Sequence, residues 1–593
     1  MRRLDLGVVG NGNVAALIDD AGDIAWWCLP RVDGDPLFCS LLEPAEDEGG
    51  FCRIELADGQ PTEQSYVRNT AILRTVFENT AGDRLEVTDF APRFKQFERI
   101  FRPLMIVRRL RPLAGRPRVT LRVRPRGGYG SETPEITRGS HHVRYVLPSF
   151  TLRLSTNASL TNILEERSFL LDRETFLILG ADESLTRNLE EMAGTFERET
   201  RLYWEEWCRY LALPYEWQDA VIRAAITLKL CEYEDTGAIV AALTTSIPES
   251  PEGARIWDYR YCWLRDGYFT VHALCGLGVT RTMEEYIRFV VNLGDRARDN
   301  HLQPVYSVSG EEHLPEHETT TLRGYRGIGP VRIGNEAYRQ EQNDVYGTVI
   351  LTATPAFFDQ RLVPPAGIEL FRRLEPLGEK AYALHDKPDA GIWELRRSSS
   401  VHTSSSLLCW AGCDRLARIA RRLGESGAEQ RWAKRAHEIR TSILERAWCP
   451  ETQSFASTFG GREIDASLLL LAELGLLAAD DPRFVATVAA VERILKRGDY
   501  VFRYVSADDF GQPKNAFTLC TFWYVSALAR LGRREEAREL YEKLLARRTR
   551  LGLLSEHIDP ESGDLWGNFP QTYSMVGIIQ GARLLSAPWT DRF

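Results

Sequence analysis

The stretch that organises this sequence is Arg-Ile-Trp-Asp-Tyr-Arg-Tyr-Cys-Trp-Leu-Arg-Asp-Gly-Tyr-Phe-Thr-Val-His-Ala, residues 255–273. It mixes aromatic and charged residues at the predicted start of a helix. A sugar ring offers apolar C–H faces that stack on aromatic rings, and hydroxyls that carboxylates and guanidinium groups bind. The stretch is therefore typical of a carbohydrate site. Taken alone it is equally compatible with a helix start whose aromatic residues are core and whose Arg–Asp pairs are solvated.

On its N-terminal side, the chain to about residue 181 consists of short alternating segments separated by turn residues. Examples are Arg118-Val-Thr-Leu-Arg-Val and His142-Val-Arg-Tyr-Val-Leu, which precedes Pro148. Alternation with a period of two predicts half-buried antiparallel strands. We therefore expect an antiparallel β-sandwich domain over residues 1–185.

After Ser184 the hydrophobic period changes from two to that of a helix. Residues 186–215 are predicted to form a helical linker that ends at Pro214. Long amphipathic segments follow over residues 216–593, and about twelve helices joined by long loops fit six helical hairpins closed into a ring. We expect this all-α (α/α)6 barrel to be the catalytic domain, with its site in the loops at one end. The predicted helices are 217–233, 263–276, 281–292, 335–354, 368–384 (interrupted at Pro376), 404–424, 428–448, 464–474, 482–496, 515–531, 534–547 and 571–586.

Composition limits the classes of partner. The chain has 593 residues, with 44% hydrophobic and 26% charged residues and a net charge of −9. These values are typical of a globular protein and argue against a nucleic acid or an anionic membrane as the main partner. The N-terminal sequence lacks the apolar run of a secretory signal, and no run is long enough to span a membrane. We therefore expect a cytoplasmic protein.

The cysteines and histidines do not predict a metal site. The 11 cysteines are scattered without CxxC spacing, which indicates reduced, buried residues. His313 and His317 lie four residues apart, but Pro315 between them breaks the helical face that a metal pair needs. A glycine-rich loop near Gly324 lacks a phosphate-binding signature, and no Gly-x-Ser-x-Gly elbow is present. We expect no metal and no cofactor.

Two loop segments carry candidate catalytic carboxylates. In Asp389-Ala-Gly-Ile-Trp-Glu-Leu-Arg, Glu394 follows Trp393. A carboxyl group against an indole is poorly solvated, which raises its pKa and suits it to general acid catalysis. Glu556 lies in a loop before the last predicted helix, where it could activate water if it faced Glu394. Taken alone, Glu394 is more simply explained as a glutamate near a helix N-terminus, and Glu556 as a solvated loop residue.

Together these segments resemble glycoside hydrolase family 15, the glucoamylases, glucodextranases and bacterial trehalases. The resemblance spans nearly the whole chain and rests on several ordered motifs. They are Thr236-Gly-Ala-Ile-Val-Ala-Ala, Thr244-Thr-Ser-Ile-Pro-Glu, Trp257-Asp-Tyr-Arg-Tyr-Cys-Trp-Leu-Arg-Asp, Gly324-Tyr-Arg-Gly, Gln342-Asn-Asp-Val-Tyr-Gly, Gly391-Ile-Trp-Glu, Ser555-Glu and Gly567-Asn-Phe-Pro-Gln.

The resemblance implies a β-sandwich, an (α/α)6 barrel and inverting hydrolysis of α-glucosidic bonds. By motif position Glu394 matches the general acid and Glu556 the general base, and inversion requires such carboxyl groups to stand roughly 6.5–9.5 Å apart. Arg265 and Asp266 match the pair that holds the non-reducing glucose. The other expected substrate-binding residues are Trp257, Tyr259, Trp263, Trp393, Arg503 and His557.

Two departures from the family pattern bear on the substrate. Many relatives carry a histidine and a Ser-Lys pair after the acid, whereas this chain reads Val401-His-Thr-Ser-Ser-Ser, with Ser406 in the place of the lysine. After the base, His557 replaces an acidic or amide residue. We expect both positions to act on the leaving-group side of the substrate.

The leading expectation is an exo-acting α,α-trehalase, because a cytoplasmic enzyme meets small soluble sugars. The first alternative is a glucoamylase-like hydrolase of maltooligosaccharides or of isomaltooligosaccharide and dextran fragments. A disaccharide phosphorylase would need a phosphate site in place of a second catalytic glutamate. A non-catalytic glucan-binding protein is the remaining class. A homo-oligomer is compatible with the sequence.

Overall fold

Residues 7–181 of the computed structural model form two antiparallel β-sheets that pack face to face. The structure describes residues 3–43, 49–185, 188–253 and 255–592. The first sheet has the order β1-β2-β3-β5-β12-β16, with β4 paired to β3. Its strands are β1 Gly7–Gly10, β2 Ala15–Ile18, β3 Ile24–Leu29, β4 Asp35–Phe38, β5 Phe51–Leu56, β12 Arg118–Arg124 and β16 Phe169–Leu170.

The second sheet has the order β13-β14-β15-β17-β11-β8-β7-β6. Its strands are β6 Gly59–Tyr66, β7 Leu73–Asn79, β8 Arg84–Phe90, β11 Met105–Ala114, β13 Glu135–Arg138, β14 His142–Val146, β15 Thr151–Thr156 and β17 Thr175–Ala181. A separate hairpin, β9 Phe94–Gln96 with β10 Arg99–Phe101, and the short helix α1 Leu160–Leu164 complete this part of the chain. The predicted β-sandwich is confirmed.

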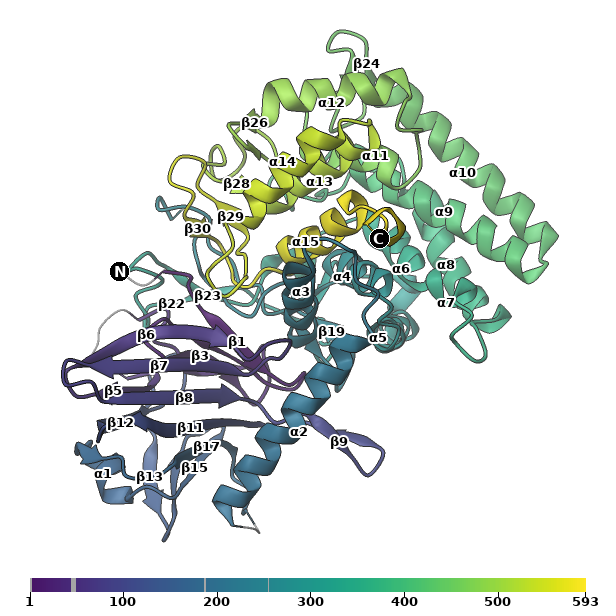
Figure 1. Cartoon of the computed structure of the whole chain (residues 1–593). Helices are drawn as coiled ribbons and strands as arrows, with labels where there is room; N and C mark the ends of the chain where they lie inside the picture. The colour runs from purple at the N-terminus through teal and green to yellow at the C-terminus, as the bar shows by residue number, and fades with distance from the viewer. Residues whose placement is uncertain (1–2, 44–48, 186–187, 254, 593) are drawn as a thin grey trace.

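Strand alternation sends side chains into two different cores. In β12, Val119, Leu121 and Val123 are buried, whereas Thr120 and Arg122 between them are half-buried. All of β3 is buried, because both of its faces are covered. Trp27 belongs to the core between the two sheets, whereas Trp26 belongs to the core of the helical domain. The first sheet therefore packs its outer face against the helices (Figure 1).

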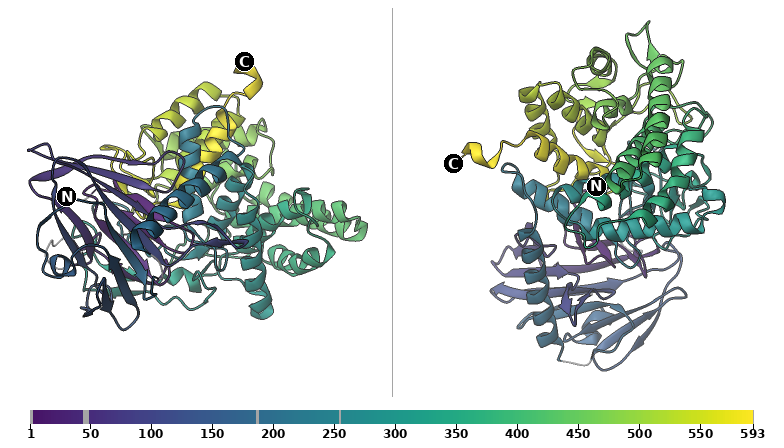
Figure 2. Two further views of the ribbon diagram at one scale, coloured as in Figure 1. Left: turned by 60° about the horizontal axis from the view of Figure 1, so that its bottom comes forward. Right: turned by 90° about the vertical axis from the view of Figure 1, so that its right-hand side faces the viewer.

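A long helix, α2 Leu189–Arg209, connects the sheets to the helical domain. Its N-cap, Asn188, accepts hydrogen bonds from the backbone N–H groups of Glu190 and Glu191. Trp204 on its inner face is fully buried. Figure 2 shows the sheets on one side of the molecule, the helices on the other and α2 running alongside.

The helical domain is an (α/α)6 barrel of alternating outer and inner helices. The inner ring consists of α4 Leu264–Gly276, α6 Asp344–Ala353, α9 Thr403–Leu423, the 3-10 turn η3 Ala466–Leu469 with α11 Leu470–Glu473, α13 Thr518–Arg530 and α15 Thr572–Leu585, and it closes where α15 packs on α4. The outer helices are α3 Gln218–Leu230, α5 Arg281–Arg296, α8 Ile368–Leu384, α10 Ser426–Arg446, α12 Pro482–Leu495 and α14 Arg534–Leu545. The predicted barrel is confirmed.

Short elements order the loops between the helices. They include η1 Arg298–Asn300, η2 Glu336–Arg339, η4 Trp589–Arg592 and the short helix α7 Pro355–Phe358. Short strands also pair within these loops, namely β18 Glu232–Tyr233 with β19 Ala238–Ile239, β20 Cys262–Trp263 with β21 Val305–Tyr306, β22 His317–Thr319 with β23 Val331–Ile333, β24 Trp448–Cys449 with β25 Ser454–Phe455, β26 Lys496–Arg497 with β27 Tyr500–Val501, and β28 Ala516–Phe517, β29 His557–Ile558 and β30 Leu565–Trp566 as a three-stranded sheet.

Three predicted helices differ from the structure. The helix expected over 335–354 is α6 alone, because Asn335 caps the 3-10 turn η2 and Gln340 is extended. The helix expected over 464–474 begins as the 3-10 turn η3. Helix α8 continues through Pro376, since Leu374 and Leu377 on either side of the proline are buried and their packing offsets the lost hydrogen bond.

All 11 cysteines are free; Cys275 is half-buried and the others are buried. None of the helices described is long and apolar enough to cross a membrane.

Candidate active site

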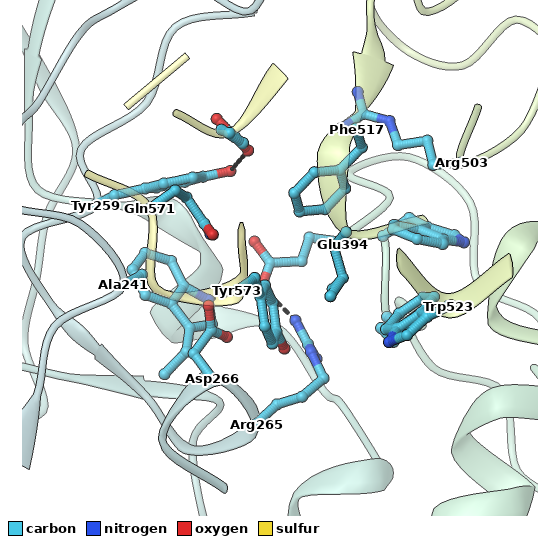
Figure 3. Close-up of a pocket in the computed structure, with 15 residues that line it drawn as sticks. Ala241, Tyr259, Arg265, Asp266, Glu394, Arg503, Phe517, Trp523, Gln571 and Tyr573 are labelled. Carbon is cyan, nitrogen blue, oxygen red and sulfur yellow. Dashed lines mark hydrogen bonds and ion pairs between the residues drawn. The ribbon is translucent and has the colours of Figure 1, made fainter. Parts of the chain in front are cut away.

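One cavity of about 550 Å³ opens at the end of the barrel where the inner helices begin. Its side chains come from the loops that lead into α4, α9, α13 and α15 and from the first two turns of α4, α13 and α15. Figure 3 shows Glu394 reaching toward the centre of this cavity, with Arg265 and Asp266 on one side. The lining residues are Ala241, Tyr259, Trp263, Arg265, Asp266, Ile392, Trp393, Glu394, Arg503, Phe517, Leu519, Trp523, Glu556, Gln571 and Tyr573.

Glu394 lies in a turn with a left-handed backbone conformation, φ 58°. Its Oε1 accepts hydrogen bonds from Trp263 Nε1 at 2.7 Å, Gln342 Nε2 at 3.2 Å and Arg265 Nη2 at 3.3 Å. Within the described part of the chain all side-chain hydrogen bonds to this carboxyl go to Oε1. The side chain keeps 24% of its surface exposed, so Oε2 is open to the cavity.

The expected contact between Glu394 and the indole of its sequence neighbour Trp393 does not form. Trp393 donates from Nε1 to Asp465 Oδ2 at 2.9 Å and packs against Trp523. The indole that touches the Glu394 carboxyl belongs to Trp263. Because the left-handed turn at Glu394 redirects the backbone, adjacent side chains diverge, and the partner comes from a distant loop.

Arg265 and Asp266 begin helix α4 and are both buried. Arg265 Nη1 bonds Gln342 Oε1 at 2.9 Å and Asp344 Oδ2 at 3.1 Å, which fixes the guanidinium plane. Burial raises the pKa of Asp266 to about 7 despite the charge of Arg265, and Glu394 adds to the rise. The pair therefore forms a rigid polar floor for the cavity.

Glu556 is 1% exposed, yet its carboxyl lines the cavity. Its Oε1 accepts a hydrogen bond from the Tyr259 hydroxyl at 2.8 Å, which is the dashed line beside Tyr259 in Figure 3. Its Oε2 is buried and has no hydrogen-bond partner among the described residues. Gly567, with φ +77°, passes so close that a β carbon there would lie 2.7 Å from Oε2.

His557 lies behind Glu556 and does not line the cavity. It is 1% exposed, and its ring stacks on Phe517 with centroids 5.2 Å apart. Its Nδ1 lies 3.5 Å from Glu556 Oε2 and its Nε2 3.5 Å from Glu249 Oε2. His557 begins strand β29, and its ring lies beside the Glu556 carboxyl and outside the lining of the cavity. A direct contact of His557 with the substrate stays a prediction.

Arg503 lines the cavity and pairs with Glu249, whose Oε2 accepts from Arg503 Nη2 at 2.8 Å. Burial opposes ionisation of Glu249, but Arg503, His557 and Arg255 together hold its pKa below the ordinary value. Glu249, Glu556 and His557 are close enough to share a metal ion. Because Arg503 already supplies positive charge to Glu249, the cluster fits an ion-pair network better than a metal site.

A second cavity of about 520 Å³ lies beyond Glu394. It shares Tyr259, Trp393, Glu394 and Arg503 with the first and adds Trp257, Arg396 and Asp508, among others. The guanidinium of Arg396 lies over the Trp257 ring, 4.4 Å from its centroid. The two cavities therefore meet at Glu394.

Sequence reasoning missed several residues of this site. Glu249, Gln342, Asp344 and Gln571 fall inside motifs quoted above, so the motif positions were the available signal. Phe517, Trp523 and Tyr573 had none, because helix starts far apart in sequence converge on the cavity. Ser406 is buried in α9 and donates to the backbone carbonyl of His385, away from both cavities.

Comparison with known proteins agrees with this architecture. A solved bacterial glucoamylase in complex with acarbose superposes with a TM-score of 0.69 at 14% identity, covering 98% of this chain and 94% of that one. Residues 2–163 match a domain described as trehalase-like, N-terminal. Residues 216–583, which contain both cavities, match a family of glycosyl hydrolases.

The protein is thus a glycoside hydrolase. More narrowly, the chain belongs to glycosyl hydrolases family 15. Among its relatives, a trehalase from Thermoplasma volcanium is 31% identical, with 97% of this chain and 92% of that protein covered. A trehalase from Mycobacterium tuberculosis is 32% identical, with 97% and 88% covered.

Proposed function

We propose that this protein is an exo-acting, inverting α-glucoside hydrolase whose substrate is α,α-trehalose. The observation that carries the proposal is that Glu394 and Glu556 line one cavity in contrasting environments, together with the Arg265–Asp266 pair. The near full-length similarity to proteins named trehalase supports the choice of substrate.

Glu394 is the proposed general acid. A protonated carboxyl group has one oxygen that donates and one that accepts. Because Oε1 already accepts from Trp263, Gln342 and Arg265, the proton resides on Oε2. From there it is delivered to the glycosidic oxygen as the bond to the departing sugar breaks.

Glu556 is the proposed general base. Burial raises the pKa of Tyr259 well above its ordinary value, and Glu556 raises it further, so Tyr259 stays protonated and donates to Glu556 Oε1. The Glu556 carboxylate then takes the proton of the attacking water. Attack from the face opposite the leaving group inverts the anomeric centre, so an α-glucoside yields β-glucose.

The residues of the first cavity are proposed to hold the glucose that is attacked. Arg265 and Asp266 present a fixed guanidinium and a buried carboxyl to the ring hydroxyls. Hydrogen bonds that tighten as the ring flattens stabilise the oxocarbenium-like transition state. The second cavity, on the other side of Glu394, receives the departing sugar, with Trp257 and Arg503 in its wall. Two sugar-binding cavities that meet at the acid suit a disaccharide.

A third cavity gives the alternative substrate a specific basis. This open cavity has a volume of about 820 Å³ and contains His402, Asp465 and Tyr504 in its lining. It shares Trp393, Leu395, Asp508 and Asp509 with the second cavity. If the third cavity bound a third glucosyl unit, the protein would suit oligosaccharides, as a glucoamylase-like hydrolase does. Glu556 supports water as the nucleophile over phosphate, and the paired carboxylates support catalysis over simple glucan binding.

Other parts of the proposal have separate support. The free, buried cysteines favour a reducing compartment, the cytoplasm. The end of β17 at Ala181 and the span of α2 support a division into a sandwich over 1–185, a linker over 186–215 and a catalytic barrel over 216–593.

The test is incubation of the purified protein with trehalose, maltotriose and isomaltotriose, with the first anomer of released glucose followed by proton NMR. We expect glucose from trehalose, with β-glucose formed from the attacked unit. Release of glucose from maltotriose or isomaltotriose, with none from trehalose, would instead establish an oligosaccharide hydrolase. Release of α-glucose from the attacked unit would disprove inversion.

A further inference from the structure

The loop that carries Tyr259 alternates its side chains between the cavity and the β-sandwich. Trp257 and Tyr259 line the cavities, whereas Asp258 and Arg260 are fully buried on the opposite side. The segment is extended: the carbonyl groups of Trp257 and Tyr259 accept hydrogen bonds from the backbone N–H groups of Ser246 and Ala242. An extended backbone sends successive side chains to opposite sides. One short segment therefore contacts both the site and the N-terminal domain.

Arg260 is anchored to the sandwich. Its Nη1 donates to the Gly34 carbonyl at 2.6 Å, and its Nη2 donates to the Tyr129 hydroxyl at 2.6 Å. Gly34 precedes strand β4, and Tyr129 lies in the loop after β12. The Tyr129 loop is itself held by Asp35, whose Oδ1 accepts from the Tyr129 backbone N–H at 2.9 Å. These two acceptors of Arg260 thus belong to the sandwich, and one of them lies in a loop that Asp35 holds.

The same guanidinium also binds its own loop. Arg260 Nε donates to Asp258 Oδ1 at 2.9 Å and Nη2 to Asp258 Oδ2 at 2.6 Å. A planar guanidinium that is buried and bonded in several directions permits little movement of the groups around it. Tyr259, which lies between the two ends of this ion pair, is therefore held in one position. Its hydroxyl is the one that donates to Glu556 at 2.8 Å.

We infer that the N-terminal sandwich takes part in catalysis by positioning the general base, through Tyr129, Arg260 and Tyr259 to Glu556. The inference rests on the proposed function, in which Glu556 activates water. Tyr129 and Arg260 touch no substrate and are positioning residues. The sandwich then contributes to the geometry of the active site, in addition to packing against the barrel.

The test removes the hydroxyl oxygen of Tyr129, which is the sandwich residue in this series of contacts. Arg260 is fully buried, so its substitution risks misfolding, whereas Tyr129→Phe deletes only the acceptor of the Arg260 Nη2 hydrogen bond. The matched control is Tyr203→Phe. The Tyr203 hydroxyl likewise accepts from a buried arginine, Arg93, at 2.8 Å, and Arg93 pairs with Glu234 at 2.6 Å. None of these three residues lines the three cavities described above.

Each full-length variant is assayed with trehalose and with α-glucosyl fluoride. Fluoride departs without a proton, so its release needs the base but not the acid. We expect Tyr129→Phe to lower kcat about tenfold on both substrates, the usual effect of losing a hydrogen bond to a charged group. KM and the thermal midpoint should stay close to those of Tyr203→Phe, which keeps the wild-type kcat.

A double-mutant cycle tests the route of the effect. Once Tyr259→Phe has removed the hydroxyl that contacts Glu556, adding Tyr129→Phe should change kcat less than about twofold, because coupled residues are not additive. The inference is overturned if Tyr129→Phe retains full kcat, if Tyr203→Phe loses as much, or if the tenfold loss persists in the Tyr259→Phe background. If the wild type hydrolyses neither substrate, the proposed function itself is wrong.

Discussion

The indole Nε1 of Trp263 lies 2.7 Å from Oε1 of Glu394, although 131 residues separate the two in sequence. This hydrogen bond holds one carboxyl oxygen of the proposed acid and leaves the other for the proton. Trp263→Phe should therefore reduce kcat on trehalose about tenfold, the usual effect of losing one hydrogen bond to a functional carboxyl. The loss should be much smaller on α-glucosyl fluoride, whose leaving group needs no proton. Equal losses on the two substrates would contradict a role through Glu394.

The two carboxylates can be told apart with the same pair of substrates. Glu394→Gln should lose about 10²–10⁴-fold in kcat on trehalose, as expected for a missing general acid. It should keep most of its activity on α-glucosyl fluoride. Glu556→Gln should lose activity on both, because both reactions need the water to be deprotonated. Initial-rate measurements on the purified variants decide the assignment, and the reverse pattern would exchange the two roles.

Asp266 should make the protein less stable as the pH rises. Burial raises its pKa from 3.8 to about 7. Between these values the folded state holds a proton that the unfolded chain has released, so the free energy of unfolding falls as the pH rises, by about 1.4 kcal/mol per pH unit. Asp266→Asn should remove this fall and should also raise KM. Urea unfolding at pH 4, 6 and 8 checks it, and an unchanged pH slope in the variant would refute the assignment.

Glu249 should stabilise the fold by neutralising Arg503. Glu249→Gln leaves a buried guanidinium with no carboxylate at 2.8 Å, and breaking such a pair costs about 3–5 kcal/mol. Because the pKa of Glu249 is held below 4.5, its contribution is complete above that pH and is lost as the pH falls through the lowered value.

The matched control for Glu249→Gln is Glu205→Gln, whose partner Arg201 is 59% exposed. This surface pair should contribute no more than about 0.5 kcal/mol. Chemical denaturation at neutral pH compares the two variants. Similar losses in both would show that the burial of Glu249 is unimportant.

Gly567 should be required for the position of Glu556. Gly567→Ala places a β carbon 2.7 Å from Glu556 Oε2 and strains a residue with φ +77°. Gly475→Ala provides the control, since Gly475 has φ +88° but no atom within 4 Å of the added carbon. Both variants should lose about 1 kcal/mol of stability from the backbone strain, and Gly567→Ala should lose more because its added carbon is crowded by Glu556. Only Gly567→Ala should lose kcat, and normal kcat in that variant would disprove the crowding of the base.

Much of the fold follows from local pattern. Alternation in segments such as Arg118–Arg124 predicts strands with one buried face, and the strand formed there buries Val119, Leu121 and Val123. The change to helical periodicity after Ser184 likewise predicts the helical half. The prediction failed where tertiary packing outweighed local signals, as at Pro376, where buried neighbours keep α8 continuous.

For the site, the sequence by itself determined which chemical groups are present and at which loops, because short motifs place Glu394, Arg265, Asp266 and Glu556 beside predicted helix starts. Only the tertiary structure decided their partners. Trp263 in place of Trp393 contacts Glu394, and His557 lies behind Glu556. The physical reason is that burial and hydrogen bonding join residues hundreds of positions apart, and the ends of separate helices meet only once the barrel has closed.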